Sequence, residues 1–483
     1  MTQIRTLNPQ QLWSYFDDIT KVPRPSGKEE KIIDFIIGFA EKHKLEYSRD
    51  EAGNILISKP ASKGFEDRKP VCLQSHLDMV CEKDSTSKHN FETDPIQTVI
   101  DGDWVKAMGT TLGADNGIGI ATQMAILSDD SIQHGPIECL FTTDEERGLN
   151  GAKALSGGFF KSKTLINLDS EDEGELFIGC AGGMNTVATL KYSTRKTPEN
   201  SVAYKIEVSG LQGGHSGGDI HKNRGNSIKI LNQFLWEARN RFASRLTMFE
   251  GGNLRNAIPR ESYAIIVIPQ AYEDVFKGYF HDYTKVLKRE YVVDEPNIKF
   301  TLESVPVPDK VIKKKVMEKL LNSIYACPHG VISWSRVMEN LVETSTNLAS
   351  VKFEGMNRIV IATSQRSSVN SAKEQIANTV RSTFKLAGAH VEQTEGYPGW
   401  NPNPESEILK ITRDAYKRVF NVDPQVKAIH AGLECGLFLE KYPYLDMISF
   451  GPTIMDPHSP SERINIKTTE KFWLLLLEVL KSV

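Results

Sequence analysis

The chain has 483 residues and a formal net charge of −4, with 40% hydrophobic and 25% charged residues. This balance is typical of a globular protein, and the length exceeds what one hydrophobic core usually serves, so we expect at least two domains. The charge gives no reason to expect a nucleic acid or an anionic membrane as a partner.

The first part of the chain alternates predicted helices and strands. The N-terminus lacks an apolar signal core, residues 8–45 are typical of two helices, and Ser26 and Glu29 form a predicted capping box for the second helix. Predicted strands follow at residues 53–58, 70–74, 136–142 and 164–168, with a helix at 118–127. This alternation favours an α/β layer with a mostly parallel sheet and helices on both faces.

Around Gly182 the pattern changes to an α+β type. A strand near 202–208 leads into the glycine-rich loop GLQGGHSGGD and a helix at Asn226–Phe242. Segments 256–269 and 347–365 each contain an Asn, an apolar strand and then a helix, a weak internal repeat that suggests a duplicated half-domain. We expect this stretch to be an inserted α+β lid domain.

After residue 397 the first pattern returns, with a predicted helix at 406–420, a helix start at 431–439 and a strand at 445–450. We therefore expect a catalytic domain in two parts, residues 1–185 and 398–483, interrupted by a lid at 186–397. The apolar run Phe472–Leu480 is too short to span a bilayer. Six scattered cysteines without a CxxC pair favour buried thiols and a cytoplasmic location.

Polar side chains gather where the predicted strands end. Ligands of parallel α/β sheets bind outside the carboxyl ends of the strands. The residues directly after strand ends are His76, Asp78, Glu145, Glu146, Asp169 and His458, and Asp115 lies among glycines at the mouth of a helix. Taken singly, Asp115 can be a helix cap and each histidine a surface or core residue. Their shared placement favours one site.

Such a cluster is hard to tolerate without cations. Two like charges about 4 Å apart repel by about 4 kcal/mol at an effective dielectric of about 20. Divalent ions reverse the sign of this interaction, and paired metal sites use a bridging carboxylate between ions roughly 3.5–4 Å apart. Histidine with carboxylates suits Zn²⁺, with Mn²⁺ and Co²⁺ as alternatives.

The ordered motifs resemble those of the M20 metallopeptidases. They are His76-Leu-Asp78, Gly-Ala-Asp115-Asn-Gly, Thr-Asp-Glu145-Glu146, Asn-Leu-Asp169 and His458-Ser-Pro. The lid motif around His215 and the length of the insert resemble the aminoacyl-histidine dipeptidase branch of that family.

The resemblance implies roles for these residues. One metal would bind His76, Asp115 and Asp169, and the other Asp115, Glu146 and His458, with a cis peptide bond between Asp115 and Asn116. Asp78 would orient the ring of His76, and Glu145 would be the general base for a water held by both ions. His215 would stabilise the oxyanion, while Asn256, Arg366 and Gly432 would contact the substrate. An ordinary ion pair on the lid surface is the alternative for Arg366.

The sequence therefore predicts a two-metal dipeptidase acting on small unblocked peptides, notably Xaa-His and β-Ala-His, as a homodimer whose lid closes over the site. Another M20 hydrolase, such as a tripeptidase, carboxypeptidase or aminoacylase, would have the same centre. A metal-binding protein without catalysis is the second alternative, and the presence of Glu145 argues against it.

Overall fold

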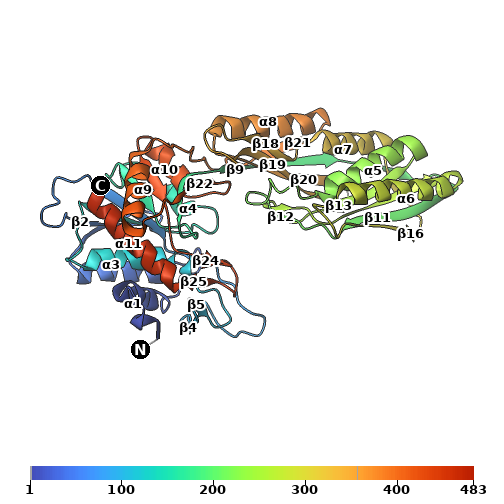
Figure 1. Cartoon of the computed structure of the whole chain (residues 1–483). Helices are drawn as coiled ribbons and strands as arrows, with labels where there is room; N and C mark the ends of the chain where they lie inside the picture. The colour runs from blue at the N-terminus through green and yellow to red at the C-terminus, as the bar shows by residue number, and fades with distance from the viewer. Residues whose placement is uncertain (1–2, 356) are drawn as a thin grey trace. The chain divides into compact units, whose positions relative to one another are not determined.

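The structure is a computed structural model that describes residues 3–355 and 357–483. The chain forms two compact units (Figure 1). Unit 1 comprises Met1–Cys180, Trp400–Ala428 and Leu433–Val483, and unit 2 comprises Ala181–Gly399 and Ile429–Gly432. The short return of the chain into unit 2 at Ile429–Gly432 has no counterpart in the sequence-based division.

Unit 1 contains both ends of the described chain. Its elements before the insertion are η1 (Gln3–Thr6), α1 (Gln10–Ile19), α2 (Glu30–Lys42), β1 (Glu46–Arg49), β2 (Ile55–Lys59), β3 (Val71–His76), β4 (Thr98–Asp101), β5 (Trp104–Ala107), α3 (Ala114–Ser128), β6 (Ile137–Thr142), α4 (Asn150–Ala154), β7 (Thr164–Asn167) and β8 (Glu175–Cys180). Those after it are α9 (Glu407–Phe420), β22 (Gln425–Ile429), α10 (Cys435–Lys441), β23 (Asp446–Ser449), β24 (Ile454–Met455), β25 (Arg463–Asn465) and α11 (Ile466–Ser482).

The main sheet of unit 1 has the strand order β1-β2-β6-β3-β7-β23-β8-β22. Its centre is parallel, because β3 runs parallel to β6 and β7, and β23 runs parallel to β7. Strand β3 is buried along its whole length, as expected for a strand covered on both faces. The pairings of β1 with β2, β2 with β6 and β23 with β8 are antiparallel. The parallel strands therefore end together at one edge of the sheet.

A second sheet in unit 1, ordered β24-β25-β5-β4, was not predicted from the sequence. Strands β24 and β25 pair antiparallel and form a hairpin whose loop contains His458. Pairing of β25 with β5 holds this hairpin in place. The strands are too short to produce an alternating hydrophobic pattern, which explains why the sequence did not reveal them.

Unit 2 is built around an antiparallel sheet with helices along it (Figure 1). Its elements are β9 (Gly182–Lys191), β10 (Thr194–Lys196), β11 (Ser201–Ser209), β12 (Gly214–His215), α5 (Ser227–Phe242), β13 (Arg245–Gly251), β14 (Ala257–Ile258), β15 (Ser262–Pro269), η2 (Gln270–Tyr272), α6 (Glu273–Glu290), β16 (Lys299–Val305), β17 (Lys310–Ile312), α7 (Lys314–Ala326), β18 (Gly330–Trp334), β19 (Val342–Glu354), β20 (Arg358–Ser367), α8 (Asn370–Leu386) and β21 (His390–Gln393).

The large sheet of unit 2 is ordered β16-β11-β15-β13-β19-β20-β9-β21, with β18 paired to β19. One hydrophobic core extends along it and includes Phe234 of α5, Phe276 of α6, Leu320 of α7 and Phe384 of α8. The two segments of the weak internal repeat differ in structure: the first holds one long strand before α6, whereas the second spans parts of both β19 and β20 before α8.

Most long elements lie where the hydrophobic pattern places them, but two local predictions were wrong. Helix α10 begins at Cys435, not at residue 431. Ser26 and Glu29 form no reciprocal cap: the Ser26 hydroxyl donates to the Met79 carbonyl, and the Glu29 carboxylate accepts from Gly27 N and Asp144 N. Tertiary contacts therefore replace the local cap. Within residues 3–355 and 357–483, no helix is long and apolar enough to cross a membrane.

Candidate metal centre

Polar side chains lie at the carboxyl ends of the parallel strands of unit 1, along one edge of the sheet. His76 is the last residue of β3, Glu145 and Glu146 follow β6, and Asp169 follows β7. Because β3 pairs in parallel with both β6 and β7, these residues emerge side by side. The α/β pattern therefore produces the convergence by its topology alone.

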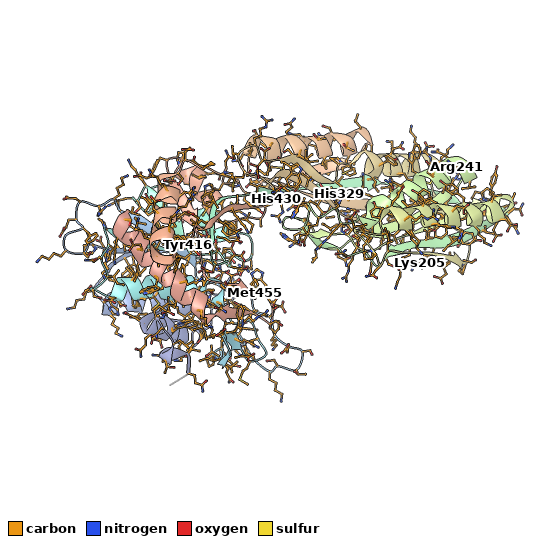
Figure 2. The ribbon with its side chains drawn as sticks, viewed as in Figure 1. Lys205, Arg241, His329, Tyr416, His430 and Met455 are labelled. Carbon is orange, nitrogen blue, oxygen red and sulfur yellow. The ribbon has the colours of Figure 1, made fainter. Side chains whose placement is uncertain are left out.

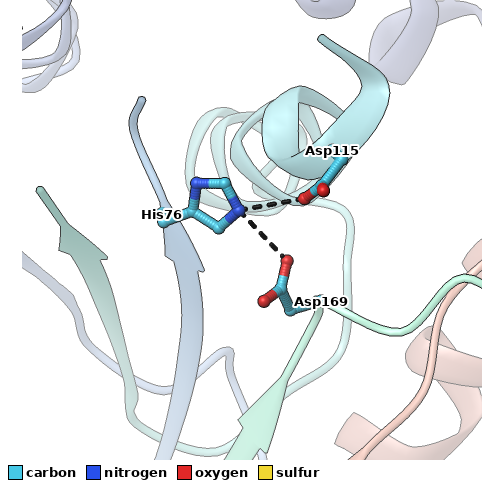
Figure 3. A group of neighbouring side chains, drawn as sticks. All are labelled: His76, Asp115 and Asp169. Carbon is cyan, nitrogen blue, oxygen red and sulfur yellow. Dashed lines mark hydrogen bonds and ion pairs between the residues drawn. The ribbon is translucent and has the colours of Figure 1, made fainter. Parts of the chain in front are cut away.

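Asp115 connects two histidines through its two carboxylate oxygens. Its Oδ1 lies 3.0 Å from His76 Nε2, and its Oδ2 lies 3.2 Å from His458 Nε2. The Asp115–Asn116 peptide bond is cis, the geometry that the family resemblance implies. Figure 3 shows Asp115 at the start of α3, facing His76. One carboxylate therefore belongs to two groups of potential ligands.

Each group is completed by a further acid. Asp169 Oδ1 lies 3.3 Å from His76 Nε2 (Figure 3), and Glu146 Oε1 lies 3.0 Å from His458 Nε2. Ligand atoms of His76, Asp115 and Asp169 all lie within 4.8 Å of one another, and so do those of Asp115, Glu146 and His458. The side chain of His76 is almost fully buried, whereas that of His458 is 50% exposed. The second group therefore lies nearer to solvent.

Asp78 supports both sides of this centre. Its Oδ1 lies 3.3 Å from His76 Nδ1 and accepts a 3.0 Å hydrogen bond from Glu145 N, while its Oδ2 accepts a 3.2 Å bond from Glu146 N. Burial opposes ionisation of Asp78, but its hydrogen bonds to His76 and the Glu145 N–H outweigh this and lower its pKa to about 2. Asp78 is therefore a carboxylate in contact with a ring nitrogen and two backbone donors, as a residue that orients a metal ligand would be.

Glu145 differs from its neighbour Glu146 in what surrounds it. Its side chain lies near His76 and Glu146. Burial, together with the charges of Asp169, Glu434 and Glu146, raises the pKa of Glu145 well above the ordinary value, against the opposing effect of His76. A carboxyl whose pKa is raised by burial and neighbouring charges is a candidate for a general acid–base group.

The electrostatics of the cluster fit divalent cations. Burial opposes protonation of His76, but Asp169 and Asp115 outweigh it and raise the pKa of the ring well above its ordinary value. Hydrogen bonds to Asp115 and Glu146 raise the pKa of His458 to about 11. The surrounding carboxylates thus favour positive charge at both rings, and a metal ion supplies positive charge to the same nitrogen and oxygen donors. The nitrogen and oxygen donors of the cluster therefore suit two divalent ions that share Asp115.

A buried belt of polar side chains lies beneath the centre and was not predicted from the sequence. Asn167 donates to Gln74 Oε1 at 2.6 Å, and Gln74 donates to Glu434 Oε2 at 2.6 Å and to Thr142 Oγ1 at 3.1 Å. Thr142 donates to Glu434 at 2.8 Å, and Ser449 donates to Asn167. Burial raises the pKa of Glu434 to about 8. The belt joins four parallel strands just before the predicted ligands. Polar residues within otherwise apolar strands are the sequence feature that could have predicted it.

The remaining predicted residues lie in unit 2. Arg366 of β20 is largely buried and donates to the Tyr397 hydroxyl at 3.3 Å. Gly432 lies against the same ring, since a Cβ added there would meet Tyr397 atoms at 2.8 Å. The backbone carbonyl of Asn256 accepts from Ser216 N at 2.7 Å, which places Asn256 beside the loop that holds His215.

His215 has a defined tautomer. Its Nδ1 accepts hydrogen bonds from Gly217 N at 3.3 Å and Gly218 N at 3.1 Å. Burial and the charge of Arg366 lower the pKa of the ring. The ring is therefore neutral with its proton on Nε2, so that Nε2 is a hydrogen-bond donor.

Comparison with known proteins agrees with this geometry. A model of peptidase family M20/M25/M40 matches residues 72–482. The chain belongs to the M20 family of peptidases. The match includes all the predicted ligands and Glu145, and the peptidases of this family are metal-dependent.

Two relatives within the M20 family resemble the chain over its whole length. The cytosol non-specific dipeptidase of Escherichia coli strain K12 is 44% identical over 483 residues, which cover 100% of this chain and 99% of that protein. The crystal structure of an aminoacylhistidine dipeptidase from Vibrio alginolyticus superimposes with a TM-score of 0.93 at 42% identity, covering 100% of this chain and 98% of that one. The predicted fold class and the dipeptidase branch of the M20 family are thereby confirmed.

A more distant structure shares only the fold. Aminopeptidase PepT from Bacillus cereus has a TM-score of 0.57 at 16% identity and covers 99% of both chains.

Proposed function

We propose that this M20 peptidase is a two-metal dipeptidase that hydrolyses the peptide bond of small unblocked dipeptides, notably Xaa-His and β-Ala-His. The observation that carries this proposal is the carboxylate of Asp115, which lies between two ligand groups with Glu145 close by. The names of the two full-length relatives, a non-specific dipeptidase and an aminoacylhistidine dipeptidase, support the substrate class.

The five residues proposed to hold the ions are His76, Asp115, Glu146, Asp169 and His458. Neutral imidazole nitrogen and carboxylate oxygen suit Zn²⁺ best, with Co²⁺ and Mn²⁺ as alternatives. When bound, the ions supply Lewis acidity and lower the pKa of a coordinated water. Proton release from His76 and His458 accompanies ion binding, so affinity should rise with pH.

Glu145 is proposed as the general base. Its carboxylate takes the proton of the attacking water, and the resulting carboxylic acid passes that proton to the nitrogen of the departing amine. Asp78 keeps Glu145 in place by accepting the hydrogen bond from its backbone N–H. Glu146, whose N–H bonds to the other oxygen of Asp78, is directed to the ligand group of His458. Two adjacent acids thus serve separate purposes.

The residues of unit 2 are proposed to recognise the substrate. His215 Nε2 is a neutral donor, as stabilisation of an oxyanion requires. Arg366 has a guanidinium that can pair with a substrate carboxylate in a fork. Asn256 and Gly432 would contact the peptide beside them. We also propose that residues 1–185 and 398–483 form the catalytic domain and residues 186–397 the lid. The lid is proposed to close when substrate binds.

We further propose a cytoplasmic homodimer. The cytosolic name of the Escherichia coli relative supports the location. Six cysteines with free thiols, five of them buried, also suit a reducing compartment.

The test is metal analysis combined with a substrate panel. Purified protein should hold two divalent ions per chain, lose dipeptidase activity on chelation and regain it with Zn²⁺, Co²⁺ or Mn²⁺. The panel compares β-Ala-His, Gly-His, Ala-Ala, a tripeptide and an N-acetyl amino acid. Dominant turnover of the acetylated compound would indicate an aminoacylase, and dominant turnover of the tripeptide a tripeptidase. Metal binding without any hydrolysis would remove the enzyme assignment.

A further inference from the structure

The turn that carries Asp115 is held by a carboxylate distant in sequence. Glu462 Oε2 accepts hydrogen bonds from Leu112 N at 2.8 Å and Gly113 N at 2.9 Å. Its Oε1 accepts from Ala114 N at 2.7 Å and Asp115 N at 3.3 Å. Four consecutive backbone donors therefore converge on one side chain, which is only 2% exposed.

Glu462 comes from the same loop as His458. Both residues lie between β24 and β25, whose antiparallel pairing closes the hairpin. His458 has a φ of 60°, a left-handed conformation that is rare for a residue with a side chain. His458 of this loop thus lies beside one carboxylate oxygen of Asp115, and Glu462 of the same loop accepts a hydrogen bond from the backbone N–H of Asp115.

The guanidinium of Arg24 donates hydrogen bonds to backbone carbonyl groups of the turn and of the segment after β3. Its guanidinium donates to Leu77 O at 3.1 Å, to Asp78 O at 2.8 Å and to Gly113 O. Arg24 is 3% exposed, and burial lowers its pKa, with the charge of Glu462 the largest opposing effect. The same guanidinium therefore ties the segment after β3 to the turn before α3.

The surroundings of Gly113 leave no room for a side chain at this position. Its φ is +69°, and a Cβ there would lie 2.5 Å from Arg24 Nη2. The glycine is thus required by the close approach of Arg24 as well as by the backbone conformation.

Both carboxyl oxygens of Glu462 are used as hydrogen-bond acceptors. Each of its oxygens accepts from two N–H groups, and each of these four partners is a backbone donor. Charge-assisted bonds from several amides to one carboxylate are among the stronger hydrogen bonds in proteins. The backbone of the turn therefore depends on this one side chain for its hydrogen-bond acceptors.

We propose that Glu462 is a positioning residue of the metal centre, which couples the His458 loop to the Asp115 turn so that the two ligand groups form together. The inference rests on the proposed two-metal function. Loss of the carboxylate would release the turn and the hairpin loop from each other. Ion binding would then weaken, whereas contacts between the protein and the dipeptide would be unchanged.

The experiment compares Glu462→Gln with Glu470→Gln, a matched change at an exposed position on α11. In Glu462→Gln, one amide nitrogen faces two N–H donors in place of an acceptor. Metal-free protein is titrated with Zn²⁺ by calorimetry, in the presence of a competing chelator where binding is tight. We expect Glu462→Gln to bind at least one ion tenfold or more weakly, and Glu470→Gln to match the wild type. At saturating Zn²⁺, KM for the dipeptide should be unchanged.

The outcomes separate the inference from the proposed function. If the wild type binds no Zn²⁺, the metal centre itself is wrong. If the wild type binds two ions and a folded Glu462→Gln, verified by circular dichroism, binds them with equal affinity, the positioning role is wrong. Should Glu462→Gln fail to fold, Glu462→Asp keeps the charge on a shorter side chain, and its affinity for Zn²⁺ must lie below that of the wild type. Equal affinity in Glu462→Asp would then overturn the inference.

Discussion

Replacement of Asp78 by Asn tests the central support of the proposed metal centre. The change keeps the shape of the side chain but removes its charge and turns one acceptor into a donor. Oδ1 of Asp78 faces His76 Nδ1 and Glu145 N, and Oδ2 faces Glu146 N. In either orientation of the amide, its NH₂ group meets at least one of these donors.

The magnitude follows from the hydrogen bonds that this replacement breaks. A hydrogen bond to a charged group contributes about 1.5–3 kcal/mol, and a buried donor left unpaired costs about 1–3 kcal/mol. If the loss falls on the transition state, kcat/KM should decrease by about 10²- to 10³-fold, since about 1.4 kcal/mol corresponds to a factor of ten. Part of the loss should be recovered at high metal concentration, because His76 is among the affected groups.

The assay is steady-state hydrolysis of Gly-His at several Zn²⁺ concentrations, with metal content measured on the same samples. Asp414→Asn, at an exposed position on α9, is the matched control and should behave as the wild type. If Asp78→Asn keeps more than a third of the wild-type kcat/KM with an unchanged metal content, the support that we assign to Asp78 is refuted.

Three further predictions concern the base, the lid and acid stability. Glu145→Gln should keep both ions by elemental analysis and lose about 10²- to 10⁴-fold in kcat, so near-normal turnover would exclude Glu145 as the base. Arg366→Ala should raise KM for dipeptides about tenfold or more at constant metal content, and an unchanged KM would remove Arg366 from the site. Burial and the charge of Arg366 lower the pKa of His430, labelled in Figure 2, from 6.5 to about 3. Between pH 6.5 and pH 3 the unfolded chain therefore binds more protons at this residue than the folded chain does. The free energy of unfolding consequently falls as the pH is lowered through this range. Between pH 7 and 5 the free energy of unfolding should decrease by about 2 kcal/mol more in the wild type than in His430→Gln, and equal slopes in urea titrations would contradict this.

The long elements and the clustering of polar residues after the strands could be predicted from the sequence because their signals are local. A buried strand such as β3 is a continuous apolar run, and the acid or histidine that follows it marks the strand end. Parallel pairing then determines where these side chains meet. Sheet topology brings His76 and Asp169 together, whereas Asp115 reaches them from the start of α3.

The residues that support the centre could not be found in this way. Glu462 acts on backbone N–H groups at residues 112–115, and backbone donors leave no trace in side-chain patterns. Arg24 likewise binds carbonyl groups. The Ser26 and Glu29 pair matched a local capping motif, yet both side chains bond to tertiary partners. Long-range polar contacts therefore override the local pattern here.

One member of the second ligand group, His458, is separated along the chain from all the other proposed ligands by unit 2. His76, Asp115 and Glu146 precede the insertion, and so does Asp169, whereas His458 and Glu462 follow it. During synthesis His76, Asp115 and Asp169 are translated long before the residues of the β24–β25 hairpin. The second proposed ligand group can therefore be completed only after the whole of unit 2 has been translated.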